Sequence, residues 1–131
     1  MNRFFRNWGP ILAYFLFIFL LSSLPIHVKE GPDKILHALE YGLMGFLAAR
    51  GVLLTWNLSR FWGVVLGGSM ALAFGVFDEL HQHFVPGRTA SVFDALADLV
   101  GGVLGAWLFV YLGAWLYGSR KLYPDTHDKC C

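Results

Sequence analysis

Three long runs without a charged residue constrain this chain more than any other feature. They cover residues 8–24, 61–77 and 99–117, and each is 17 to 19 residues long. A helix needs about 20 apolar residues to cross a bilayer. A fourth run, residues 35–49, contains only one histidine and one glutamate, both near its start. The sequence therefore predicts an all-α membrane bundle of four transmembrane helices.

The predicted spans leave no separate soluble domain. We place them at about residues 8–24, 35–54, 61–80 and 94–117, in a single membrane domain over residues 1–131. Hydrophobic residues make up 56% of the chain and charged residues 15%, against roughly 45–50% and 25% in soluble domains. This balance excludes an ordinary soluble domain. The partner that it implies is the lipid bilayer, and we expect no nucleic-acid partner and no cofactor.

The basic residues predict the orientation of the bundle. Lys and Arg beside the spans keep their loops in the cytoplasm, and seven of the ten fall on one side, namely Arg3, Arg6, Arg50, Arg60, Arg120, Lys121 and Lys129. Both termini should therefore be cytoplasmic (N-in/C-in), which places the loops at residues 25–34 and 78–94 outside. A cleaved signal peptide is the alternative for the first run. That run is longer than a typical h-region, however, and no A-x-A-like site follows it.

Helical geometry brings polar residues of three spans to one membrane depth. Residues three or four apart share a helix face. On the second span this spacing aligns Asp33, His37 and Tyr41, with Lys34 and Glu40 beside them. The same spacing holds at the end of the third span for Asp78 with Gln82 and Glu79 with His83, and at the start of the fourth for Ser91, Asp94 and Asp98. We therefore expect the three helix ends to converge on a polar pocket, in which direct or single-water contacts link His37, Glu79 and Asp94.

Depth within the spans separates functional candidates from interface markers. An ionisable group at the centre of a span costs about 2.5–3.5 kcal/mol on insertion scales, so it normally faces a partner or a water-filled cavity. His37, Glu40 and Asp98 lie one or more turns inside, which favours a functional role. Charges at the span ends, such as Lys34, also fit a second interpretation, in which they only mark the boundary between lipid and water. The glycines, including the G-x-x-x-G pair Gly101 and Gly105, are interpreted as close-packing sites.

The loop "VPGRTAS" carries a further candidate. Pro86 and Gly87 favour a turn, and Thr89 or Ser91 can cap the following helix. Arg88 then projects over the polar pocket, where a guanidinium can bind a carboxylate or phosphate through two parallel hydrogen bonds. The alternative is an internal ion pair with one of the acids in the pocket, Asp78, Glu79 or Asp94.

Two segments of the sequence, "DKILHALEYGLMG" and "FDELHQHFVPGRTASVFDALADLVGGVLG", resemble the VanZ-like family of small bacterial membrane proteins. The family takes its name from an accessory teicoplanin-resistance protein. The resemblance implies a multi-pass protein of the bacterial inner membrane with a role in the cell envelope, and possible glycopeptide (teicoplanin) resistance. One position departs from the family pattern, because Asp98 stands where the family more often has Asn. An acid there makes the predicted pocket more anionic.

Three functions fit these residues. The first is a binding protein whose extracytoplasmic pocket takes an envelope lipid, a cell-wall precursor or a glycopeptide-like molecule. The second is an intramembrane enzyme acting on a lipid-linked phosphate or glycosyl substrate, with His37, Glu79 and Tyr41 as catalytic candidates. The third is a metal site built from His37, Glu79 and Asp78, with His81 or His83. It lacks a paired-ligand signature such as H-E-x-x-H, and we predict no metal. The expected ligand-binding residues are Asp33, Lys34, His37, Glu40, Tyr41, Asp78, Glu79, Gln82, Arg88, Ser91, Asp94 and Asp98.

The predicted orientation can be tested with reporter fusions. Fusions at Asn57 and at the carboxyl-terminal tail should report a cytoplasmic position, and fusions at Lys29 and Gly87 should report the outside, because the basic residues flank the former pair. An external signal from the tail would contradict the orientation.

Overall fold

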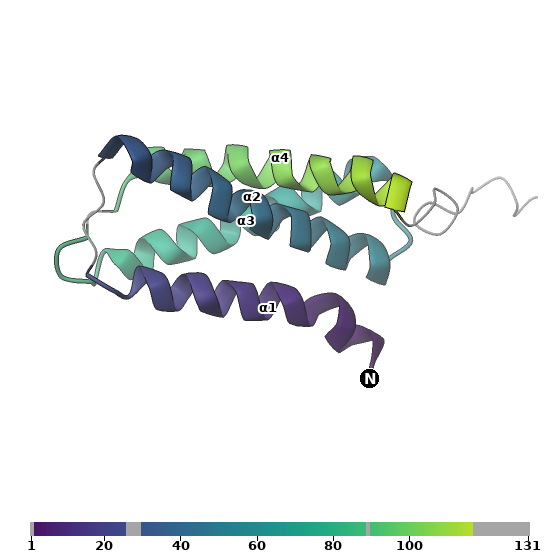
Figure 1. Cartoon of the computed structure of the whole chain (residues 1–131), viewed down its shortest axis with the longest axis horizontal. Helices are drawn as coiled ribbons and strands as arrows, with labels where there is room; N and C mark the ends of the chain where they lie inside the picture. Colours follow the sequence, from purple (N-terminus) through teal and green to yellow (C-terminus); the bar gives the residue numbers. More distant parts are fainter. Residues whose placement is uncertain (1, 26–29, 89, 117–131) are drawn as a thin grey trace, which may run out of the picture.

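The computed structural model describes residues 2–25, 30–88 and 90–116, and four helices make up this part of the chain (Figure 1). Helix α1 covers Arg3–Ser22, α2 Glu30–Thr55, α3 Arg60–Gln82 and α4 Val92–Leu116. All four are long and apolar enough to cross a membrane, and the described residues contain no strand. The prediction of an all-α bundle of four membrane helices is therefore confirmed.

The first helix begins earlier than the apolar run that predicts it. The α1 helix starts at Arg3, where the side-chain oxygen of Asn2 accepts a hydrogen bond from the Phe4 amide at 3.5 Å. This cap satisfies one of the amide groups that a helix start leaves without a partner. The α3 helix continues to Gln82, two residues beyond the expected end of the third span. Polar residues can continue a helix beyond its apolar run, because the helix end lies near the membrane surface or faces other side chains of the bundle.

Helices α2 and α4 form the centre of the bundle and lie side by side, whereas α1 lies at its edge (Figure 1). The end of α1, the start of α2, the end of α3 and the start of α4 all gather at one end of the molecule, on the left in Figure 1. We call this the polar end. The amino terminus and the connection between α2 and α3 lie at the other end.

Glycines let the backbones of α2 and α4 touch. A Cβ atom at Gly105 of α4 would collide with the carbonyl oxygen of Gly42 in α2, and one at Gly101 would collide with that of Ala38. A Cβ atom at Gly45 would in turn meet the carbonyl of Gly102. Small residues allow this close approach between membrane helices. The G-x-x-x-G pair of the sequence is thus a packing feature, as expected, and its partner is α2.

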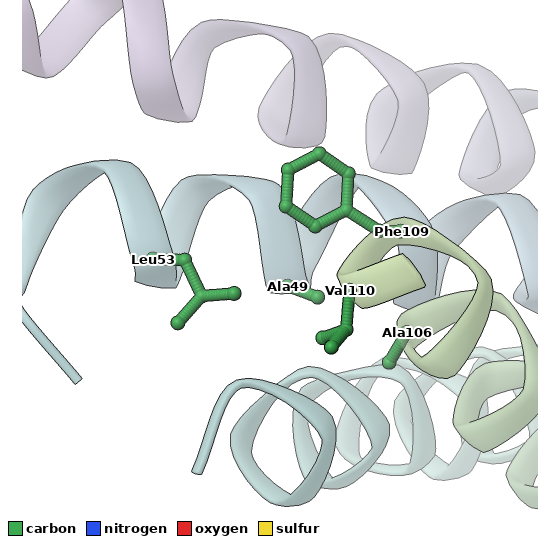
Figure 2. Close-up of a cluster of buried hydrophobic side chains, with 5 residues drawn as sticks. All are labelled: Ala49, Leu53, Ala106, Phe109 and Val110. Atoms are coloured by element: carbon green, nitrogen blue, oxygen red, sulfur yellow. The ribbon is translucent and has the colours of Figure 1, made fainter. Parts of the chain in front are cut away.

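The apolar side chains divide between a small core and a lipid-facing surface. Figure 2 shows one core cluster, which joins α2 and α4 away from the polar end and contains Ala49, Leu53, Ala106, Phe109 and Val110. Large apolar side chains on all four helices are exposed, and the buried set includes eight polar or charged residues. This distribution suits a protein that is surrounded by hydrocarbon rather than by water.

Helix α1 is held to α2 and α3 by polar contacts along its length. Near its start, the side-chain amide of Asn7 donates to the Leu54 carbonyl at 3.2 Å, and the Trp8 indole donates to the Thr55 hydroxyl at 3.0 Å. Halfway along, the Tyr14 hydroxyl donates to the carbonyl of Glu40 at 3.1 Å. These bonds fix the position of a helix that buries few of its own residues.

The glycine contact between α2 and α4 generates a stability prediction. Gly105→Ala should destabilise the bundle by roughly 1–3 kcal/mol, the usual cost of overpacking, because its methyl group would meet backbone that cannot rotate away. Gly42→Ala is the matched control, since a Cβ there lies 3.4 Å from the nearest atom, the Gly101 carbonyl oxygen. Thermal unfolding in detergent should show a lower midpoint for Gly105→Ala alone. Equal midpoints would contradict the proposed backbone contact.

Candidate functional site

The polar end contains a cluster of side chains that are hidden from the surface although they carry charge or strong hydrogen-bonding groups. They come from the first turns of α2, the last turns of α3 and the first turns of α4. The buried members are His37, Asp78, Glu79, Gln82, Asp94 and Asp98. Lys34 is exposed, and Asp33, Glu40 and Arg88 are half-buried. The structure therefore brings the ends of these three helices together, as the sequence predicts.

His37 lies at the centre of this cluster and contacts both neighbouring helices. Its Nδ1 atom lies 3.0 Å from Oδ1 of Asp98 on α4, and its Nε2 atom lies 4.0 Å from Oε1 of Glu79 on α3. A carboxylate beside Nδ1 favours the tautomer that carries its proton there. The Tyr41 ring stacks one turn below at 6.4 Å, with its hydroxyl directed at the Phe74 carbonyl. The imidazole is thus held in one orientation, with Nε2 facing Glu79.

A glycine makes room for the carboxylate of Asp98. A Cβ atom at Gly75 of α3 would lie 2.6 Å from Oδ2 of Asp98. The sequence indicated Gly75 only as a packing residue, because a missing side chain does not reveal what fills its space. Gly75 therefore belongs to the site, since it admits a fully buried carboxylate between α3 and α4.

Glu79 connects the site to the loop between α3 and α4. Its Oε2 atom accepts a hydrogen bond from the backbone amide of Ser91 at 2.9 Å. Ser91 thus acts through its backbone, whereas the sequence singled it out for its hydroxyl. The other oxygen of Glu79, Oε1, is buried without a hydrogen-bond partner and faces His37.

Asp78 faces away from His37, towards α1. It accepts hydrogen bonds from the Ser22 hydroxyl at 2.5 Å and from the Gln82 amide at 2.8 Å. Beside it, the Ser23 hydroxyl lies 2.9 Å from Nε2 of His81. Sequence reasoning missed the two serines, although they are the only hydroxyl residues at the end of the first apolar run.

The direct partner of His37 differs from the expected one. We expected His37, Glu79 and Asp94 to share a network of direct or single-water contacts, and all three are buried at the polar end. The residue on α4 that contacts His37 directly is Asp98, one turn further into the membrane. The carboxylate of Asp94 lies 3.6 Å from the ammonium group of Lys34. It also has an oxygen within 4.8 Å of a ring nitrogen of His37, a separation that one water molecule can bridge, as expected.

Acids outnumber bases at the polar end. The described residues there include six carboxylates, against one lysine, one arginine and three histidines, His37, His81 and His83. The six carboxylates are those of Asp33, Glu40, Asp78, Glu79, Asp94 and Asp98. Three buried carboxylate oxygens have no hydrogen-bond partner, on Glu79, Asp94 and Asp98. Buried acceptors without a partner are costly. The cluster therefore suits additional hydrogen-bond donors.

A polar cavity of about 150 Å³ opens beside this cluster, between α1, α2, α3 and the loop that carries Arg88. Its polar lining consists of Ser22, Asp33, His37, Glu40, Asp78, Gln82 and Arg88, and its apolar lining of Ile18, Leu21 and Leu36. Of the twelve residues predicted to bind a ligand, six line this cavity. Lys34, Tyr41, Glu79, Ser91, Asp94 and Asp98 do not, and they support or surround those that do.

Arg88 forms no internal ion pair with the described acids of the site. Its Nε atom is buried and has no hydrogen-bond partner within the described part of the chain. An internal pair with Asp78, Glu79 or Asp94 was one of two alternatives, and no such pair is formed within 4.0 Å among the described residues. The guanidinium therefore presents donors that a ligand in the cavity can use.

Some of these groups could hold a metal ion. Donor atoms of His37, Glu79 and Asp98 lie within 4.8 Å of one another. Ligands of an ion bound at about 2.0–2.2 Å are closer, roughly 3–3.5 Å apart, so the three side chains would have to move together. The metal alternative from the sequence used His37, Glu79 and Asp78, with His81 or His83 as a further ligand, and the first two of these belong to the group above. Asp78 and His81 are engaged by serines of α1, and His83 is exposed.

Comparisons with known proteins agree with this architecture. The family profile described as VanZ/LLP1 matches residues 2–116, a stretch that includes the four helices and the entire polar end. No curated protein and no solved structure gives a significant match to the chain. The profile covers most of the sequence, and the residues that carry the earlier resemblance lie within it. The chain therefore belongs to the VanZ/LLP1 family.

Proposed function

We propose that this protein resides in the bacterial inner membrane and binds the polar head of an envelope lipid in the cavity at its polar end. The observation that carries the proposal is the state of Arg88. Its Nε atom is buried at the wall of the cavity without a hydrogen-bond partner among the described residues, while the rest of the polar wall consists mainly of hydrogen-bond acceptors. A bound head group would provide an acceptor for Arg88 and donors for the acceptors of the lining.

The size of the cavity favours a lipid head over a larger ligand. Pockets for drug-sized molecules enclose roughly 300–1,000 Å³, and this cavity encloses about 150 Å³. A complete glycopeptide or a whole cell-wall precursor exceeds it, whereas the head group of a lipid, or one part of a larger head, fits. A cavity of this size therefore favours an envelope lipid over the antibiotic itself as the ligand.

The lining also defines the chemistry of the head group. Arg88 can hold a phosphate or carboxylate in two parallel hydrogen bonds. Asp33 and Glu40, which also line the cavity, can accept hydrogen bonds from hydroxyl or amine groups. We therefore expect a ligand that carries one anionic group together with hydroxyl or amine donors.

A lipid could reach the cavity from within the bilayer. Leu21 of α1 and Leu36 of α2 form part of the cavity wall and are also exposed on the lipid-facing surface. The gap between α1 and α2 at the polar end would thus admit a head group while its chains remain in hydrocarbon. If the predicted orientation holds, the cavity faces the outer leaflet.

Arg88→Lys tests the proposal. Lysine keeps the charge but offers a point charge instead of a planar pair of donors, so binding of the head group should weaken about tenfold or more, in line with the 1.5–3 kcal/mol of a charged hydrogen bond. The measurement is retention of radiolabelled total envelope lipid by the purified protein, at matched expression.

Arg3→Lys is the matched control, because it makes the same chemical change at an exposed position far from the cavity. Thermal unfolding in detergent reports whether either variant alters the bundle. Unchanged lipid retention by Arg88→Lys would mean that the guanidinium contributes only charge, and the proposed capture of an anionic group would be wrong.

A second candidate function is supported by the environment of His37. This residue lines the cavity, and its Nδ1 atom is held by the buried carboxylate of Asp98, an arrangement that orients an imidazole for proton transfer. An enzyme acting on a lipid-linked phosphate or glycosyl group would use His37 as the general base, with Arg88 stabilising charge. Tyr41 fits that second role less well, because it lies one turn below and does not line the cavity.

His37→Gln separates the two candidates. A general base contributes about 10²–10⁴ to the rate, so an enzyme would lose nearly all turnover of lipid-linked phosphate when His37 is replaced. A binding protein would show no product with either the wild type or the variant, and a change in lipid retention only. Phosphate release from total envelope lipid, followed for the wild type and His37→Gln, provides the measurement.

A further inference from the structure

A second concave surface lies on the outside of the bundle, along the contact between α2 and α4. It is a groove of about 710 Å³ with an almost entirely apolar lining. Its lining contains Gly42, Gly101 and Gly105, and the missing side chains of Gly101 and Gly105 let the two helices touch. The walls are the larger side chains Ile35, Leu39, Leu43, Phe46, Val100, Leu104 and Leu108.

One end of the groove carries a positive charge. Lys34 is the only charged residue in the lining, and it lies at the polar end of the bundle. Its side chain is 47% exposed, although its ammonium group lies 3.6 Å from Asp94. An ammonium group has three donors, so Lys34 can contact Asp94 and a second acceptor outside the bundle.

The length of the groove matches one leaflet of a membrane. It runs along α2 from Lys34 to Phe46, a difference of 12 residues, or about 18 Å at 1.5 Å per residue. Half of the hydrocarbon core of a bilayer measures about 15 Å. A chain anchored at the interface beside Lys34 would therefore occupy the groove down to the middle of the membrane.

We infer that the groove between α2 and α4 is a binding site for one hydrocarbon chain of an anionic lipid, whose phosphate pairs with Lys34. The surface is apolar where hydrocarbon surrounds it, and it carries the exposed ammonium group of Lys34 where the lipid phosphates lie. The groove is deepest at the glycines, because the larger side chains on either side of them extend further outward. A second copy of this chain is less suited to the groove, because the glycines that would mediate such contact are already in contact with the neighbouring helix.

This site is independent of the proposed head-group cavity. The groove uses Lys34, Ala38 and Gly42 of α2, whereas the cavity uses His37 and Glu40. The two linings share no residue, and at 100° per residue Ala38 and Gly42 lie about 160° from Glu40, although Lys34 and His37 are only about 60° apart. Either site can therefore be present without the other.

The charge at the head of the groove can be tested with defined lipids. The wild-type protein, reconstituted in nanodiscs with equal amounts of phosphatidylglycerol and phosphatidylcholine and then extracted, should retain the anionic lipid in native mass spectrometry. We expect a preference of about fivefold, the effect of one lysine near a membrane surface. Lys34→Arg should keep this preference and Lys34→Gln should abolish it. Equal retention of both lipids by the wild type would show ordinary annular contact and overturn the inference.

The groove itself is tested by filling it. Leu104→Trp places a larger side chain on its wall and should lower retention of both lipids, whereas Leu96→Trp, the same change at a similarly exposed site on α4 outside the groove, should not. Equal retention by the two variants would also overturn the inference. If Lys34→Gln does not fold because it leaves Asp94 unpaired, the double variant Lys34→Gln/Asp94→Asn restores the charge balance and carries the same test.

Discussion

The direct contact between the backbones of α2 and α4 determines the rest of this structure. Gly101 lies against Ala38 and Gly105 against Gly42, so the two helices run parallel and in a fixed register. The same register brings His37, next to Ala38, within 3.0 Å of Asp98, one turn before Gly101 and Gly102. Side chains between the helices would separate these polar groups. The glycines therefore position the site as well as the fold.

The distribution of side chains in the bundle is the reverse of that in a soluble protein at the polar end. Large apolar side chains face outward on all four helices, and charged groups are enclosed. Isolated charges would be costly at this depth, but here they are shared among hydrogen bonds from Ser22, Gln82 and the Ser91 amide. The surplus of carboxylates over bases remains, which is why the proposed ligand supplies donors. A site with equal numbers of acids and bases would gain less from a ligand that supplies hydrogen-bond donors.

Helix α2 separates two surfaces of opposite character. The face with His37 and Glu40 borders a small polar cavity, and the face with Ala38 and Gly42 borders a long apolar groove. Lys34 lies at the end of the groove and pairs with Asp94 of the polar end. One short segment of α2 therefore serves both proposed lipid contacts, the head group on one side and a separate hydrocarbon chain on the other.

The sequence by itself determined the four helices and the depth of the polar residues, because uncharged runs of membrane length and charges within them leave few alternatives. It also identified His37, Glu40 and Asp98 as residues that need a partner or a water-filled cavity inside the bundle. Which partners they take was decided only by the tertiary structure. Helical periodicity assigns each residue to a face but does not give the rotation and shift of one helix against another. Hence Asp98 rather than Asp94 contacts His37, Gly75 accommodates a carboxylate, and Ser22 reaches Asp78 across 56 positions in the chain.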